Sequence, residues 1–117
     1  MNILVVEDEK AICKGVEKII NDAYKCAVIF TSDNENDAIK ILNREKIELF
    51  LLDIKLNDGS GYDIALKIRR IPGYELTPII FITSLHTKEL EAYRSIHCYS
   101  YITKPFTDKQ IIDANII

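Results

Sequence analysis

In this 117-residue chain, side chains with carboxylate, hydroxyl and ammonium groups stand at the ends of apolar runs or directly after them. Glu7 and Asp8 follow the first apolar run, and Asp53 ends the central run. Thr83 ends the fourth run, and Lys104 follows the fifth. Carboxylates held close together repel one another and need either a cation or shared protons. Hard oxygen ligands suit Mg²⁺. An ionised Asp is also a nucleophile that can take a phosphoryl group when a metal and a fixed cation offset the charge. The residue types therefore predict metal-assisted phosphoryl chemistry on a carboxylate.

Each member of this set has a role in such chemistry and also a simpler explanation. We expect Asp8 and Asp53 to be metal ligands, Asp53 to be the nucleophile, Lys104 to be the fixed cation, and Thr83 to hydrogen-bond a phosphoryl oxygen once it arrives. The simpler explanations are that the acidic pair after the first run caps a helix, where the helix dipole favours negative charge, and that the others are ordinary turn, surface or strand-end residues.

The surrounding sequence alternates apolar runs with helical patterns. The central run, Ile47 to Asp53, is too short for an independent helix and does not alternate, which is typical of a strand buried on both faces. The five expected strands are Asn2 to Val6, Cys26 to Phe30, Ile47 to Asp53, Pro78 to Thr83 and Tyr99 to Thr103.

Helical spacing of apolar residues follows each strand. Ser32 with Glu35, and Thr107 with Gln110, have the spacing of capping boxes that begin the second and last helices. The stretch Asn57 to Gly61 is expected to be a turn before the third helix, and residues 87–96 form a weaker helical pattern.

Five strands alternating with five helices predict an α/β fold with one parallel sheet covered on both faces, because parallel strands need right-handed crossover connections. The polar residues at the strand ends then share one edge of the sheet, where sites of α/β proteins lie. We expect residues 1–117 to form a single domain.

Composition limits the classes of function. The net charge of −3 gives no sign of a nucleic-acid surface, and Cys13, Cys26 and Cys98 lack the spacing of a disulfide framework or a zinc site. No leader peptide and no apolar run long enough to cross a bilayer is evident, so we expect a cytoplasmic protein without membrane contact.

The chain resembles the receiver domain of bacterial two-component response regulators over essentially its whole length. In that family an acidic pair, an Asp, a Thr or Ser, an aromatic residue and a Lys before a Pro recur in this order. The matching positions are Glu7, Asp8, Asp53, Thr83, Tyr101, Lys104 and Pro105.

The resemblance implies a flavodoxin-like (βα)5 sheet of order 2-1-3-4-5 and transfer of phosphate from a sensor histidine kinase to Asp53. It implies Mg²⁺, with Mn²⁺ as a substitute, held by Asp8, Asp53 and the backbone carbonyl of Lys55. Glu7 stands where Asp is also common, and its longer side chain is expected to reach the metal through water. The bond before Pro105 is expected to be cis.

The resemblance also implies a switch rather than a conventional enzyme. Thr83 moves to the phosphoryl group, Tyr101 fills the vacated space, and the fourth helix, fifth strand and fifth helix present a new surface on which a homodimer can form. Lys55 and Leu85 do not activate water well, so we expect slow self-dephosphorylation. Likeness to receivers that precede LytTR-type domains suggests control of transcription, with DNA contacted only by an effector domain outside this chain.

Other classes of function remain as alternatives. An aspartyl phosphatase on a related sheet needs a second Asp at the position of Lys55, and a nucleotide-binding protein needs a glycine-rich loop that Gly59 and Gly61 do not form. A third alternative is an interaction module that has the fold without the phosphate chemistry.

Overall fold

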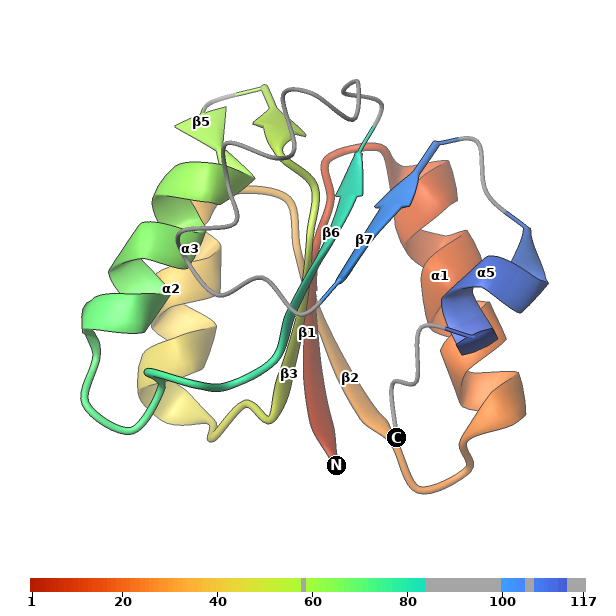
Figure 1. Cartoon of the computed structure of the whole chain (residues 1–117), viewed down its shortest axis with the longest axis horizontal. Coiled ribbons are helices and arrows are strands. Elements are labelled where there is room, and N and C mark those ends of the chain that lie inside the picture. The colour runs from red at the N-terminus through yellow and green to blue at the C-terminus, as the bar shows by residue number, and fades with distance from the viewer. Residues whose placement is uncertain (58, 84–99, 105–106, 114–117) are drawn as a thin grey trace.

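A five-stranded parallel sheet forms the centre of the computed structural model, which describes residues 1–57, 59–83, 100–104 and 107–113. Its strand order is β2-β1-β3-β6-β7, which confirms the predicted order because these are the first to fifth strands expected from the sequence. The strands are β1 Asn2–Val6, β2 Val28–Ser32, β3 Leu49–Leu52, β6 Ile79–Thr83 and β7 Ser100–Thr103 (Figure 1).

Helices cover both faces of this sheet. Helices α1 (Lys10–Ala23) and α5 (Asp108–Asp113) lie on one face, and α2 (Glu35–Arg44) and α3 (Gly61–Arg70) lie on the other (Figure 1). The helix predicted over residues 87–96 lies outside the described residues. Within the described ranges, none of the helices has the length and apolar content that crossing a bilayer requires.

The two central strands are buried along almost their whole length. All four residues of β3 are buried, as are Ile3–Val6 of β1. Ile3 and Val5 pack with Val16 and Ile20 of α1, whereas Leu4 packs in a separate cluster with residues of α2 and α3. This two-sided burial explains why the sequence of each central strand is continuously apolar.

The start of α2 differs from the predicted capping box. Asn34, not Ser32, is the N-cap, and its side chain accepts a hydrogen bond from the Asp37 amide at 2.8 Å. Ser32 is the last residue of β2, paired with Val6, so the strand continues further than expected and the helix begins later. The capping box at Thr107 and Gln110 is confirmed, with reciprocal bonds of 2.8 and 3.3 Å.

A small hairpin occupies the segment that was predicted to be a simple turn. Strands β4 (Lys55–Leu56) and β5 (Gly59–Ser60) pair antiparallel between β3 and α3. At its exit, the Gly61 amide donates to the Ile54 carbonyl at 2.9 Å. A Cβ atom on Gly61 would lie only 2.1 Å from the Asp53 carbonyl oxygen. The hairpin is therefore packed directly against the main chain of Asp53.

Replacing Gly61 by Ala should lower the free energy of unfolding by about 1–3 kcal/mol, because the added methyl group forces a backbone shift. Gly59→Ala is the matched control, since nothing lies within 4 Å of a Cβ at that position. Urea denaturation of both variants measures the difference. Equal stability of the two variants would show that the contact at Asp53 is not tight.

Candidate functional site

Acidic side chains and one lysine meet at the carboxyl edge of the sheet. Glu7 and Asp8 follow β1, Asp53 follows β3, and Lys104 follows β7. Carboxylate oxygens of the three acids lie within 4.8 Å of one another. Glu7 and Asp53 are only 5% and 4% exposed, whereas Asp8 is half-buried. Four of the residues predicted to form one site are thus brought together.

The hydrogen-bond ladder of the sheet fixes the positions of Glu7 and Asp53. The Glu7 amide donates to the Ser32 carbonyl and the Asp53 amide to the Val6 carbonyl, each at 2.9 Å. Both bonds extend the parallel pairing by one residue beyond the strands. The two carboxylates therefore project from adjacent, rigid strand ends, where their separation is set by main-chain geometry.

Lys104 connects the two buried acids. Its Nζ atom lies 2.5 Å from Glu7 Oε1 and 3.1 Å from Asp53 Oδ2, with Glu9 Oε1 further away at 3.7 Å. Burial opposes the charged form of Lys104, but the hydrogen bonds to Glu7 and Asp53 outweigh it and raise the pKa of the ammonium group. Lys104 therefore supplies a positive charge to this cluster, and its role in phosphoryl transfer stays a prediction.

Glu7 titrates far from its ordinary range. Burial raises its pKa to about 7, a hydrogen bond with Asp53 acts in the same direction, and Lys104 opposes both. Burial and Asp53 together outweigh Lys104, so a proton is held on Glu7 up to near neutral pH. Contact with Lys104 was not anticipated for Glu7, and its predicted contact to metal through water stays a prediction.

Main-chain amides each bind one further oxygen of the three carboxylates. The Lys55 amide donates to Asp53 Oδ1 at 3.2 Å, the Asn57 amide to Asp8 Oδ2 at 2.6 Å, and the Glu9 amide to Glu7 Oε2 at 3.5 Å. Sequence reasoning missed the contribution of Asn57, because a main-chain donor has no characteristic residue type. The one sequence feature that points to this donor is the position of Asn57, four residues after Asp53.

The donor set fits a hard divalent cation. Its three acids supply only oxygen ligands, and Lys104 leaves an excess of negative charge that a metal would neutralise. Asp8 and Asp53 stay the predicted carboxylate ligands of such an ion. The backbone carbonyl of Lys55, two residues beyond Asp53, stays a predicted ligand.

Several residues predicted to belong to the site lie outside the described residues, or have side chains that do. Thr83 ends β6 beside Thr103, and Tyr101 of β7 pairs with Phe81, but the side chains of Thr83 and Tyr101 lie outside the described part. Pro105 and Leu85 also lie outside the described residues. The switch and the cis peptide bond therefore stay predictions.

Comparison with known proteins decides the family. The family described as the response regulator receiver domain matches residues 3–115. The chain belongs to this receiver family. Receiver domains are the phosphorylation-dependent switches of two-component signalling, and the chain is such a domain rather than a conventional enzyme.

Regulatory proteins are among the relatives of this receiver domain. The transcriptional regulatory protein DltR of Streptococcus agalactiae is 33% identical over 96% of this chain and 49% of its own length. The sensory transduction protein LytT of Bacillus anthracis is 27% identical over 96% of this chain and 44% of its own length, consistent with the expected LytTR-type subfamily. The receiver domain thus spans about half the length of these curated relatives.

Solved structures confirm the fold. The Mn²⁺-bound form of the response regulator Rcp1 has a TM-score of 0.82 at 22% identity, over 96% of this chain and 86% of that one. A likeness at this identity concerns the arrangement of sheet and helices. It agrees with the flavodoxin-like parallel sheet predicted from the sequence.

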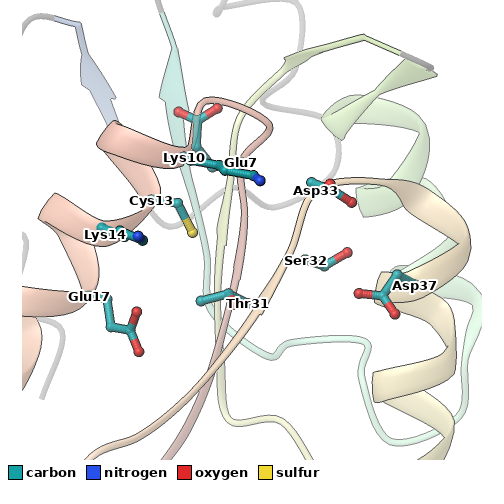
Figure 2. A pocket seen from close by; sticks show the side chains of 9 residues that line it. All are labelled: Glu7, Lys10, Cys13, Lys14, Glu17, Thr31, Ser32, Asp33 and Asp37. Atoms are coloured by element: carbon teal, nitrogen blue, oxygen red, sulfur yellow. The ribbon is translucent and has the colours of Figure 1, made fainter.

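A cavity of about 330 Å³ adjoins the acidic cluster of the receiver domain on the side of α1. Figure 2 shows Cys13, Lys14 and Glu17 on α1 facing Thr31 and Ser32 of β2, with Glu7 at the upper end. Burial raises the pKa of the Cys13 thiol, and the negative charges of Glu17, Glu7 and Asp33 raise it further by smaller amounts. The thiol is therefore protonated.

Replacing Lys104 by Met should destabilise the metal-free receiver domain by roughly 3 kcal/mol at about pH 8, because two buried carboxylates lose their counter-charge. Added Mg²⁺ should restore part of this loss, so that a fixed Mg²⁺ concentration stabilises the variant more than the unaltered protein. Lys18→Met is the control, since Lys18 and Asp22 form an exposed pair on α1. Thermal and urea unfolding with and without Mg²⁺ measure these effects, and identical behaviour of the two variants would contradict them.

The raised pKa of Glu7 predicts a pH dependence of stability. Folded Glu7 binds a proton more tightly than unfolded Glu7, so Mg²⁺-free stability should decrease as pH rises from 4.5 to about 7. The decrease assigned to this group should be about 1–3 kcal/mol. Urea denaturation across this range, with Glu7→Gln as the reference lacking the titrating group, isolates the effect. A difference between the two proteins that does not change with pH would refute it.

Proposed function

We propose that Asp53 of this receiver domain accepts a phosphoryl group from a sensor histidine kinase. The observation that carries the proposal is the buried Asp53 carboxylate, with Lys104 Nζ 3.1 Å from Oδ2 and two further acids beside it. Asp8, Asp53 and the Lys55 carbonyl would hold Mg²⁺, with Glu7 contacting it through water. The Mn²⁺-bound form of Rcp1, which has the same fold, supports binding of a divalent ion and Mn²⁺ as a substitute.

The proposed reaction is a direct transfer. One Asp53 oxygen forms a bond to phosphorus while the bond between phosphorus and the kinase histidine nitrogen breaks, and the histidine leaves with the electron pair. A bound Mg²⁺ would neutralise charge on the phosphoryl oxygens. Lys104 already contacts Asp53 Oδ2 and supplies the second positive charge to the same group. The Lys55 amide, donating to Oδ1, holds the carboxylate plane in a fixed orientation.

Phosphorylation would then act through Thr83 and Tyr101. The Thr83 hydroxyl would hydrogen-bond a phosphoryl oxygen, and Tyr101 would move into the space that Thr83 leaves. These two movements would remodel the surface formed by the fourth helix, β7 and α5. A change from mostly inactive to mostly active requires about 5 kcal/mol of differential stabilisation, a magnitude that new charge-assisted bonds can supply. We expect a homodimer through this surface and control of transcription through an effector domain outside this chain.

Acetyl phosphate with Mg²⁺ should produce a protein adduct heavier by one phosphoryl group, detected by intact mass spectrometry. Asp53→Asn should give no adduct, whereas Asp63→Asn, which changes an acid on the first turn of α3, should react normally. The adduct should decay over minutes or longer after the reagent is removed, because Lys55 and Leu85 are poor at activating water. Loss of the adduct within seconds would overturn the slow decay.

The same experiment separates the alternative functions. Continuous release of inorganic phosphate without an adduct would indicate a phosphatase, and no reaction at all would indicate an interaction module. Sedimentation of the adduct tests dimerisation, since the proposed dimer requires a doubled mass that Asp53→Asn does not show.

A further inference from the structure

The β4–β5 hairpin contacts the two predicted metal ligands with main-chain amides. Its first residue, Lys55, donates to Asp53 Oδ1 at 3.2 Å, and its turn residue, Asn57, donates to Asp8 Oδ2 at 2.6 Å. Asp8 and Asn57 are 49 positions apart in the sequence, so the second bond joins the β1–α1 loop to the hairpin. One short segment thus reaches both carboxylates.

We infer that the main-chain N–H of Asn57 is a positioning donor that orients Asp8 to bind the metal. This inference rests on the proposed function. By occupying Oδ2, the amide leaves the other oxygen of the Asp8 carboxylate for the ion. Donors that orient a ligating carboxylate strengthen metal binding because the ligand is already in place before the ion arrives. Asn57 acts through Asp8 and does not itself touch the ion.

The orientation of the Asp8 carboxylate depends on a main-chain donor more than the orientations of Glu7 and Asp53 do. Glu7 and Asp53 are buried and are both held by Lys104. Asp8 is half-buried, and within the described ranges its carboxylate has the Asn57 amide as its one hydrogen-bond partner. Without that bond, the Asp8 side chain would sample other rotamers in solvent, and the ion would have to order it on binding.

The hairpin holds the Asn57 amide at a defined place relative to Asp53. Lys55 pairs with Ser60 and Leu56 with Gly59, which closes the hairpin around Asn57. Its exit residue Gly61 is packed against the Asp53 carbonyl, with no room for a Cβ atom. The distance between the donor for Asp8 and the backbone of Asp53 is therefore set by local packing, so the amide also sets the spacing of the two ligands.

The donor belongs to the main chain, which gives the inference a specific signature. Every residue except proline supplies an N–H at position 57. Asn57→Ala removes the exposed side chain and keeps the donor, whereas Asn57→Pro removes the donor. These two variants form a matched pair in which the presence of the hydrogen bond is the intended difference.

Calorimetric titration of the metal-free protein with MgCl₂ tests the inference without any measurement of phosphorylation. Asn57→Ala should bind Mg²⁺ as the unaltered protein does, and Asn57→Pro should bind about tenfold more weakly. Equal affinity of the two variants would overturn the inference while leaving the proposed function in place. If the unaltered protein binds no Mg²⁺, the proposed function fails and the inference fails with it.

A second measurement covers the case in which Asn57→Pro does not fold. In the metal-free protein, the Asn57 amide proton should resonate downfield because it is bonded to a carboxylate, and Asp8→Ala should move it upfield. The Lys55 amide proton, bonded to Asp53, should keep its shift in Asp8→Ala and serves as the internal control. An Asn57 resonance that does not respond to Asp8→Ala would overturn the inference.

Discussion

The ion pairs of Lys104 with Glu7 and Asp53 are the interaction on which the rest of the site depends. Two carboxylates that are almost fully buried at adjacent strand ends repel one another and are poorly solvated, so they need a cation within hydrogen-bond distance. Lys104 meets this need only in part, because Asp8 adds a third carboxylate to the cluster. The unbalanced charge favours a proton on Glu7, and it would equally favour the divalent ion of the proposed function.

The sheet provides the rigidity that this charge arrangement requires. Repelling carboxylates would separate if they stood on flexible loops, but Glu7 and Asp53 are bonded through their amides to the neighbouring strands. The strands below them are buried on both faces by two groups of apolar side chains, one packed on α1 and α5 and the other on α2 and α3. Burial of this core thus stabilises a cluster of charges that would not hold together alone.

The sequence was sufficient for the strand order and for the meeting of Glu7, Asp8, Asp53 and Lys104, because in a parallel sheet all strand ends of one kind share an edge. It was insufficient at the start of α2, where both Ser32 and Asn34 are good caps and the length of β2 decided between them. It also gave no sign of the Asn57 donor, since main-chain hydrogen bonds depend on the path of the chain and hardly on residue type. The protonation of Glu7 depends on burial, which only the folded structure reveals.

The two ways in which the acids are held divide the site into two parts. Lys104 binds the buried pair and occupies Glu7 Oε1 and Asp53 Oδ2, whereas the hairpin amides bind Asp53 Oδ1 and Asp8 Oδ2. Asp8 is the most exposed of the three acids, and it has no ion pair with Lys104 in the described part of the chain. Asp53 belongs to both parts, because one of its oxygens contacts Lys104 and the other contacts the hairpin. A group placed on Asp53, as the proposed function requires, would therefore alter both sets of contacts at once.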